Sequence, residues 1–394
     1  MIDHESTVII VDNSLDHTGA LKAILSTSVT LSDSYEFIFV LPQNTRITQL
    51  VRDHEFRVYT LPFVELSKRP RDVFSYLPYL VKNGFALSRL ITSHNARIVH
   101  VNDYYNLVGI VAKALVPSIA LVTHIRKLPN SFPILLSQLW LQLHARFSDK
   151  VICVSQTVRR QLRPYYPADL IYDGIRSKEK HPPRRLRNRM RGRIKLLYLG
   201  HFIPGKGQDY ALEAFRRAYL QCKEIRLRFV GGDMGLEKNR KFRESLEFRA
   251  EDWGISDVVK FDGFAYDVEK EIKEADIVLN FSESESFSLA CLEALHYGTP
   301  LIASDSGGPA ELFEHRRSGY LVENRDVNSM IEAILFLARN PEERHRYSSA
   351  SVDHVKERFS TCNTTQRLKE VYDKLTSTAG ARGTVLNTGQ LISQ

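Results

Sequence analysis

Short hydrophobic runs rich in β-branched residues alternate with segments of helical periodicity along most of the chain. Most of the gaps between the runs have room for one helix. This alternation is typical of a mostly parallel sheet that is buried on both faces. The strands it predicts are residues 8–12, 36–42, 57–62, 97–101, 119–124, 150–155 and 170–175, and then 194–200, 225–232, 258–264, 275–282, 300–305 and 319–323.

A basic run from Lys178 to Lys195 separates the two series of strands. The fold class we expect is therefore α/β, with two Rossmann-like, doubly wound domains joined by a linker. The last amphipathic stretch predicts a helix, and the Gly, Thr, Ser and Asn residues after it predict disorder. The expected boundaries are 1–177 for the first domain, 178–193 for the basic linker, 194–360 for the second domain, 361–376 for the C-terminal helix and 377–394 for the tail.

The composition is that of an ordinary globular protein, with 43% hydrophobic and 25% charged residues among 394. Much of the net charge of +8 comes from the basic run. That run contains no aromatic residue on which a base would stack, so a charged linker is a better interpretation than a nucleic-acid site. We therefore expect no nucleic-acid partner.

The N-terminal residues lack a basic start before the first apolar run, which indicates a strand rather than a signal peptide. Lys113 and Pro117 interrupt the longest apolar region, Leu107 to Val122, so this region does not predict a membrane span. We therefore expect a cytoplasmic protein. The four cysteines lie far apart, which predicts buried thiols and indicates neither a disulfide framework nor a metal cluster.

Glu293 is unusual because it lies in an apolar segment, Leu289 to Leu295, that predicts a buried helix. Gly298 and Pro300 suit the end of that helix. A buried ionised carboxylate is strongly destabilising unless a donor binds it, and no Lys or Arg lies within a turn. A distant residue or a ligand would have to bind Glu293. The alternative is a narrow solvent-facing stripe that Glu293 shares with His296.

A glycine-rich loop, Gly200 to Gly207, follows one predicted strand and precedes a helix. Its glycines would let backbone amides approach a phosphate, and Lys206 would add a mobile charge. The loop nearly matches a P-loop, but Gly207 stands where that motif has the Ser or Thr that holds magnesium. The pattern therefore favours a diphosphate site without a metal over an ATPase site. A glycine-rich turn with an exposed lysine is the simpler alternative.

A serine-rich loop, Ser282 to Ser288, follows the next informative strand and contains Glu285. Its serines favour capping of the buried helix, which would leave the first amides of that helix pointing outward. A third loop, Asp305 to Glu311, again follows a strand and opens a helix, with Pro309 in its first turn.

Carboxylates, helix-start amides and one lysine together describe a pocket for a molecule with hydroxyls at both ends and a diphosphate between them. A sugar nucleotide has this chemistry. The loops that carry these groups follow strands, and ligands bind at the carboxyl ends of strands in such folds. The sequence therefore predicts a sugar-nucleotide site.

The segment Glu285 to Glu311 resembles the family-four retaining glycosyltransferases, glycosyl transferases of group one, which have the GT-B fold. It matches their E-x7-E motif and the G-T-P and G-G-x-x-E blocks that follow. The resemblance extends from the first strand to about Leu375. It implies two Rossmann-like domains facing across a cleft, with the C-terminal helix packing back on the first, acceptor-binding domain.

The resemblance also implies a role for each matching residue. Glu285 would bind the donor sugar, Glu293 the ribose hydroxyls, and Lys206 the diphosphate. His124 would lie near the reacting centre, and Phe264 against the base. The matching positions are Glu285, Lys206 and His124 for catalysis, and Gly19, His201, Gly205, Phe264, Ser286, Phe287, Ser288, Leu289 and Glu293 for donor binding.

Several positions depart from the family pattern. His201 replaces the usual arginine of the cationic clamp, so part of the expected charge is titratable. The usual paired glycines near the first strand are reduced to Thr18 and Gly19. The segment Asp173 to Ile175 replaces the common Asn-Gly-Val.

The implied reaction is retaining transfer of a sugar from a UDP- or GDP-sugar to an acceptor hydroxyl, in glycan, polysaccharide or glycolipid assembly. No metal or other cofactor is expected. The alternatives are a degenerate sugar-nucleotide-binding protein without transfer and a GT-B nucleotide-sugar epimerase. Two segments also suit peripheral docking on an anionic membrane for a glycolipid acceptor. Ser67 to Phe85 combines basic residues with aromatics and leucines, and Phe132 to Phe147 is strongly apolar, although packing within the first domain is the simpler explanation.

Overall fold

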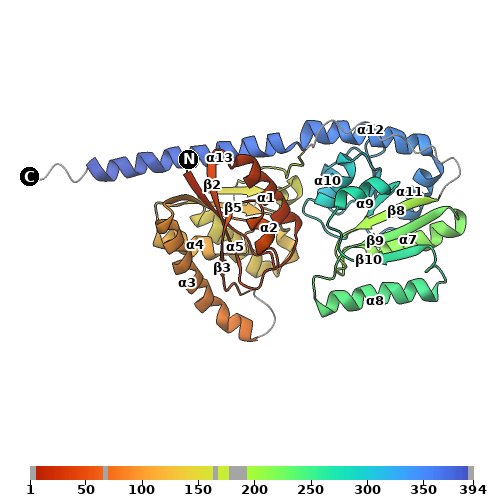
Figure 1. Ribbon diagram of the computed structural model, residues 1–394, viewed down its shortest axis with the longest axis horizontal. Helices are drawn as coiled ribbons and strands as arrows, with labels where there is room; N and C mark the ends of the chain where they lie inside the picture. Colours follow the sequence, from red (N-terminus) through yellow and green to blue (C-terminus); the bar gives the residue numbers. More distant parts are fainter. Residues whose placement is uncertain (1–5, 65–69, 163–166, 177–192, 389–394) are drawn as a thin grey trace, which may run out of the picture. The chain divides into compact units, whose positions relative to one another are not determined.

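The computed structural model describes residues 6–64, 70–162, 167–176 and 193–388. The chain forms two compact units. The first combines Met1–Gly174 with Thr361–Gln394, and the second is Ile175–Ser360. The first unit contains β1 to β7 and the second contains β8 to β13. Figure 1 labels β2, β3 and β5 of the first unit and β8, β9 and β10 of the second.

The first unit contains a seven-stranded parallel sheet in the order β3-β2-β1-β4-β5-β6-β7. Its central strands are continuous runs of Val, Ile, Leu and Phe that are buried on both faces, as expected of a covered parallel sheet. The strands are β1 (Ser6–Val11), β2 (Tyr35–Pro42), β3 (Arg57–Leu61), β4 (Ala96–Val101), β5 (Ala120–Ile125), β6 (Lys150–Cys153) and β7 (Asp169–Leu170).

Helices cover both faces of this sheet. Figure 1 shows α3 and α4 on one side and α1 and α13 on the other. The C-terminal helix α13 packs against α1, β4 and β5, and Leu368, Val371 and Tyr372 join the core of this unit. The helices are α1 (Gly19–Leu31), α2 (Thr48–Arg52), α3 (Pro70–Ser93), α4 (Val108–Leu115), the 3₁₀ turn η1 (Pro129–Ser131), α5 (Ile134–Phe147), α6 (Gln156–Leu162) and α13 (Thr361–Thr388).

The second unit contains a six-stranded parallel sheet in the order β10-β9-β8-β11-β12-β13. In both units the first strand pairs with the second and the fourth of its series, which is the doubly wound Rossmann order. Its strands are β8 (Ile194–Leu199), β9 (Ile225–Val230), β10 (Val259–Asp262), β11 (Ile277–Asn280), β12 (Leu301–Ser304) and β13 (Tyr320–Val322). Its helices are α7 (Gln208–Gln221), α8 (Glu237–Asp252), α9 (Val268–Glu274), α10 (Leu289–His296), the 3₁₀ turn η2 (Gly308–Glu311), α11 (Val327–Arg339) and α12 (Pro341–Arg358).

The two parallel sheets confirm the predicted fold class, and a strand lies in or beside each of the thirteen predicted runs. The run at 170–175 is the weakest match, because β7 is only Asp169–Leu170. The expected basic linker falls almost wholly on residues 177–192, which lie outside the described residues.

The C-terminal tail differs from the prediction. We expected disorder at 377–394, whereas α13 continues to Thr388, and only residues 389–394 lie outside the description. Two features of the sequence account for the longer helix. Residues that tolerate a helix, Ala, Arg, Leu and Thr, separate the glycines of this stretch, and a helix that is already formed can be extended without a new nucleation step. A prediction of buried thiols holds for Cys153, Cys222 and Cys291, while Cys362 is exposed. No helix within the described ranges is long and apolar enough to cross a membrane.

Candidate functional site

Three loops of the second unit meet at the carboxyl ends of the adjacent strands β8, β11 and β12. The amide of Glu283 donates to the carbonyl of Gly205 at 2.9 Å. The amide of Glu285 donates to the carbonyl of Ser306 at 3.0 Å, and the amide of Gly308 donates back to the carbonyl of Glu285 at 2.9 Å. These bonds tie together the three loops that the sequence singled out.

Two glycines are required by this close approach. Gly207 has φ of 79°, and a Cβ atom there would lie 1.9 Å from the carbonyl oxygen of Phe281. A Cβ atom on Gly308 would lie 2.4 Å from the amide nitrogen of Phe287. No side chain fits at such distances. The loops can come this close only because glycine, which has no side chain, occupies both positions.

Lys206 and Glu285 form an ion pair at the centre of the three loops. The Lys206 Nζ atom lies 2.6 Å from Glu285 Oε1, and the Ser282 hydroxyl donates to the same oxygen at 3.0 Å. The hydroxyls of Ser282, at 3.2 Å, and Tyr198 also donate to the carbonyl of Lys206. The lysine and the glutamate are thus held by the same small set of buried polar groups.

The helix α10 confirms the predicted burial of Glu293. All residues from Cys291 to His296 are buried, and Glu293 is 8% exposed. The carboxylate therefore lies at the edge of the core rather than on an open surface. Of the two interpretations left open by the sequence, the solvent-facing stripe is wrong.

The start of α10 differs from the expected serine cap. Ser288 has φ of 77°, an uncommon value for a residue other than glycine, and its side chain makes no capping hydrogen bond. Its hydroxyl instead accepts from Asn280 Nδ2 at 3.4 Å. The first amides of a helix have no partner within the helix, so those of Ser288 and Leu289 are oriented for an acceptor outside it. The third loop likewise opens a 3₁₀ turn, η2, rather than an α-helix.

His201 lies in a stack with Phe264. Their ring centroids are 5.8 Å apart with an interplanar angle of 14°, and His201 Nδ1 lies 3.2 Å from the carbonyl oxygen of Gly232. Phe264 is 40% exposed, and the ring of Tyr266 meets its edge at 5.2 Å. The structure therefore places His201 and Phe264 together, as two neighbouring flat groups.

His124 and Gly19 lie in the first unit. Gly19 begins α1 after the cap Thr18, whose hydroxyl accepts from the amide of Leu21 at 3.2 Å. His124 is 3% exposed, and burial together with the charge of Arg126 lowers its pKa well below the ordinary value. Arg126 Nη2 lies 3.3 Å from His124 Nδ1, which makes that nitrogen the acceptor and leaves the proton on Nε2.

Nε2 of His124 has no hydrogen-bond partner among the described residues, although it is fully buried. A neutral imidazole in this tautomer is a hydrogen-bond donor, because it holds one proton and that proton is on Nε2.

A buried polar chain that the sequence did not predict holds Arg126. Its guanidinium donates to both oxygens of Asp173 at 2.7 and 2.8 Å, and to Asn102 Oδ1 at 2.5 Å. Asn102 in turn donates to Asp12 Oδ2 at 2.5 Å. Asp173 is the residue at which the sequence departs from the common Asn-Gly-Val, so the unusual acid has a basic partner. In the sequence, the acid at position 173 in place of the usual Asn was the one signal that could have indicated the Arg126–Asp173 pair.

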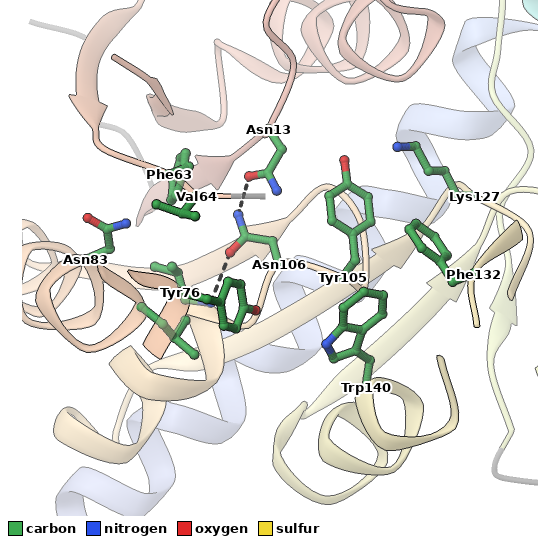
Figure 2. Close-up of a pocket in the computed structure, with 12 residues that line it drawn as sticks. Asn13, Phe63, Val64, Tyr76, Asn83, Tyr105, Asn106, Lys127, Phe132 and Trp140 are labelled. Atoms are coloured by element: carbon green, nitrogen blue, oxygen red, sulfur yellow. Dashed lines mark hydrogen bonds between the residues drawn. The ribbon is translucent and has the colours of Figure 1, made fainter. Parts of the chain in front are cut away.

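A pocket in the first unit also escaped prediction (Figure 2). It lies at the carboxyl edge of the sheet, where aromatic residues follow β3, β4 and β5. The side chains that line it are those of Asn13, Phe63, Val64, Tyr76, Leu80, Asn83, Tyr105, Asn106, Val108, Lys127, Phe132 and Trp140. The run Tyr104–Tyr105–Asn106, two residues after the end of β4, was a local signal for it.

Within the described ranges, no three His, Cys, Asp or Glu side chains come together as a set that could hold a metal ion.

Burial raises the pKa of the Cys291 thiol to about 12, so this cysteine beside the Lys206–Glu285 pair stays protonated.

Two family models match the chain. The model for glycosyl transferases group 1 matches residues 184–353, and the model for glycosyltransferase family 4 matches residues 38–178. Together they cover most of both units.

Curated relatives include enzymes and proteins of undetermined activity. The D-inositol 3-phosphate glycosyltransferase of Saccharomonospora viridis is 33% identical over 201 residues, which are 49% of this chain and 45% of the relative. An uncharacterized glycosyltransferase of Methanocaldococcus jannaschii is 23% identical over 347 residues, 84% of this chain and 92% of the relative. The match therefore spans less than half of the inositol-phosphate enzyme.

Solved structures share the fold. Anabaena HepE in complex with UDP and glucose matches with a TM-score of 0.79 at 20% identity, over 94% of this chain and 100% of that chain. Sucrose-phosphate synthase from Thermosynechococcus elongatus matches with a TM-score of 0.76 at 19% identity, over 95% and 100%. At these identities the likeness establishes the GT-B fold. The two family models and this fold together show that the chain belongs to the group 1, family 4 glycosyltransferases.

Proposed function

We propose that the protein is a retaining glycosyltransferase that moves a sugar from a nucleotide diphosphate sugar to an acceptor hydroxyl in glycan, polysaccharide or glycolipid assembly. The observation that carries this proposal is the Lys206–Glu285 pair, 2.6 Å apart where a glycine-rich loop meets the start of α10. A cation for a diphosphate and a carboxylate for sugar hydroxyls lie side by side there.

The donor is proposed to be a UDP-sugar, with a GDP-sugar as the alternative. Structures of HepE contain UDP with glucose and UDP-glucose, and HepE shares the GT-B fold with this chain. Glu293 would accept hydrogen bonds from the ribose, and Phe264 with His201 would lie against the base. The amides of Phe287, Ser288 and Leu289, with Gly205 and Ser286, would surround the sugar and phosphates.

The reaction would break the bond between the anomeric carbon and the diphosphate oxygen. A bond from the acceptor oxygen would form on the same face, and the acceptor proton would pass to the departing diphosphate oxygen. Lys206 would stabilise the negative charge that develops on that oxygen. His124, neutral with its proton on Nε2, would donate a hydrogen bond to a hydroxyl of the transferred sugar.

A membrane surface is a further proposed partner. The side chains of Phe74 and Leu77 on α3 are 81% and 66% exposed, and those of Ile134 and Leu135 on α5 are 71% and 79% exposed. Apolar side chains of this size suit an interfacial helix. Co-sedimentation with anionic and neutral vesicles at two salt concentrations tests this, and equal recovery in the supernatant under all conditions would reject it.

Nucleotide binding by the purified chain tests the donor site. Thermal shift and calorimetry with UDP, GDP, ADP and CMP, each alone and as a sugar conjugate, should show one selective diphosphate. Glu293→Ala and Lys206→Ala should each reduce the shift, while Glu237→Ala, in an exposed pair with Lys241, should not. Absence of any shift up to about 1 mM, a binding free energy weaker than roughly −4 kcal/mol, would reject the donor site.

A second candidate is a degenerate protein that binds the nucleotide sugar without transferring it. It is favoured by His201, which stacks on Phe264 and lies against the carbonyl of Gly232. The arginine that is usual at this position would supply a fixed positive charge, whereas the charge of a histidine is titratable. Product analysis separates the candidates. Transfer to an acceptor supports the first, binding with only slow donor hydrolysis supports the second, and a changed nucleotide sugar without release would indicate an epimerase.

A further inference from the structure

The pocket in the first unit is a small, partly open hollow that has the position of a ligand site. Its lining comes from the segments after β1, β3, β4 and β5 and from α3, α4 and α5. These segments meet at the carboxyl edge of a doubly wound sheet, where ligands of such folds bind.

One wall of the pocket is a set of aromatic rings packed against one another. Phe132 lies 5.2 Å from Trp140 at an interplanar angle of 83°, and 5.6 Å from Tyr105 at 40°. Tyr105 also lies 6.4 Å from Trp140. Figure 2 shows the three rings grouped on one side of the pocket. Since each ring is held by two others, the wall is formed before any ligand arrives, and it offers apolar faces to a flat ring.

The pocket lining holds both donors and acceptors. The hydroxyls of Tyr76 and Tyr105 can do either, and Asn83 Oδ1 has no hydrogen-bond partner among the described residues. Asn13 Oδ1 is occupied by a 2.6 Å bond from Asn106 Nδ2, and Asn106 Oδ1 accepts from the amide of Val108 at 3.0 Å. The amide nitrogen of Asn13 and the indole nitrogen of Trp140 have no hydrogen-bond acceptor within the described ranges. No side chain in the lining is acidic, and one, Lys127, is basic.

Lys127 is fixed at this pocket by its backbone and by a ring. Its amide donates to the buried carboxyl of Asp103 at 3.3 Å, and its Nζ atom lies 4.5 Å from the centre of the Tyr105 ring. Figure 2 shows the side chain extending towards Tyr105. Its ammonium makes no ion pair with any carboxylate that the structure describes. Lys127 therefore brings a positive charge to the lining of the pocket, and this charge also acts on the buried Asp103 carboxyl.

We propose that this pocket binds a polyhydroxylated ring that carries an anionic group, either a phosphate ester or a carboxylate. The ring lies on the aromatic wall of Tyr105, Phe132 and Trp140. The anionic group receives hydrogen bonds from Lys127 and Asn13. An anion matches a lining that has one positive charge and no acidic side chain, while the tyrosine hydroxyls and Asn83 Oδ1 suit the hydroxyls of the ring. The inference rests on the proposed function, in which this ring would be the sugar acceptor.

Calorimetry with matched anionic and neutral rings tests the proposal. The probes are glucose 6-phosphate, glucuronate, inositol phosphate, glucose, inositol and inorganic phosphate, each added to the full chain. At least one anionic ring should bind about tenfold or more tightly than its neutral counterpart, and Lys127→Gln should abolish that difference. The phosphate and carboxylate probes show which anion is preferred. Lys82→Gln is the matched control, because Lys82 also lies over a tyrosine ring, that of Tyr79 at 5.8 Å, but does not line the pocket.

Three results would overturn the proposal: equal affinity for neutral and anionic rings, an anionic preference that survives Lys127→Gln, or inorganic phosphate binding as tightly as glucose 6-phosphate. UDP binding is measured on the same samples. If the anionic ring binds but UDP does not, the proposed transferase is rejected and the proposed ligand of the pocket is supported. UDP binding without any preference for an anionic ring would reject only the pocket.

Discussion

Lys206 Nζ lies 2.6 Å from Glu285 Oε1, although the two residues are 79 positions apart in the sequence. The side chain of Lys206 is 37% exposed and that of Glu285 is 12% exposed, so the pair lies at a surface that a ligand can reach. An incoming diphosphate would compete with Glu285 for the ammonium, and sugar hydroxyls would compete with the ammonium for the carboxylate. In the structure the two partners keep each other oriented.

Replacement of Lys206 is expected to reduce turnover more than nucleotide binding. Lys206→Met should lower kcat by about 10²- to 10³-fold, the usual loss when a donor to a developing negative charge is removed. Lys206→Arg should restore part of the activity, because it keeps the charge with a different geometry. Steady-state kinetics with radiolabelled donor measures this. Equal losses of kcat in Lys206→Met and in a surface variant such as Lys241→Met would contradict the role.

Gly207→Ala is expected to destabilise the second unit through a direct clash. Gly254 also has positive φ, 64°, but a Cβ atom there would meet nothing within 4 Å. Gly254→Ala should therefore lower the free energy of unfolding by only about 1–2 kcal/mol, the penalty for left-handed backbone. Gly207→Ala adds the 1.9 Å contact with Phe281 and should lower it by roughly 1–3 kcal/mol more. Urea denaturation compares the two, and equal destabilisation would show that the loops separate easily.

The Arg126–Asp173 pair is expected to show strong coupling. The side chains are 5% and 7% exposed, so either residue alone would be a buried charge without its partner. Arg126→Leu or Asp173→Leu should each lower the free energy of unfolding by about 3–5 kcal/mol, and the double variant by less than the sum. The exposed pair Lys241–Glu237 should give less than about 1 kcal/mol in the same cycle. Additive losses at the buried pair would contradict the geometry.

The first unit is expected to lose stability in mild acid. Burial lowers the pKa of His100 to about 3 and of His144 to about 4, and it also lowers that of His124. Unfolded histidines protonate near pH 6.5, so the unfolded chain binds the extra protons below that value. The stability that these neutral histidines contribute is complete above about pH 6.5 and is lost as the pH falls towards the folded values.

Asp103 opposes this effect. Burial raises its pKa to about 6, so the folded chain retains one proton that the unfolded chain has released between about pH 4 and 6. Burial also raises the pKa of Asp173, which acts in the same direction as Asp103, so the loss of stability with falling pH is smaller than the three histidines alone would give. Urea denaturation from pH 4.5 to 7.5 measures the slope. His144→Gln should reduce it by about one proton, while the exposed His54→Gln should leave it unchanged. A flat profile would contradict the buried neutral histidines.

Local patterns were sufficient to predict the strands and the burial of Glu293. A parallel strand covered on both faces must be apolar at successive positions. A continuous apolar run such as Val8–Val11 can therefore be recognised as a strand from the sequence. The same reasoning identifies α10, in which the apolar residues surround the axis. The glycine-rich loop was also predictable, since only glycine suits backbone contacts of the kind made by Gly207.

Contacts between distant segments were not predictable from one sequence. The Lys206–Glu285 pair, the Arg126–Asp173 pair and the lining of the pocket each depend on how separate loops meet after the sheets have formed. The positive φ of Ser288 belongs to the same class, because serine is ordinarily read as a helix cap. In each case tertiary structure decided a geometry that the local sequence left open.

The helix α13 has a consequence for biosynthesis. It is made after the second unit, yet Leu368, Val371 and Tyr372 pack in the core of the first unit with Val8 and Ile10 of β1. A ribosome adding about 5–20 residues per second needs on the order of 10 s to make the intervening second unit. Throughout that interval the apolar surface of β4 and β5 against which α13 packs lacks its cover. The nascent first unit therefore exposes this surface to chaperones and to other chains until α13 has been made.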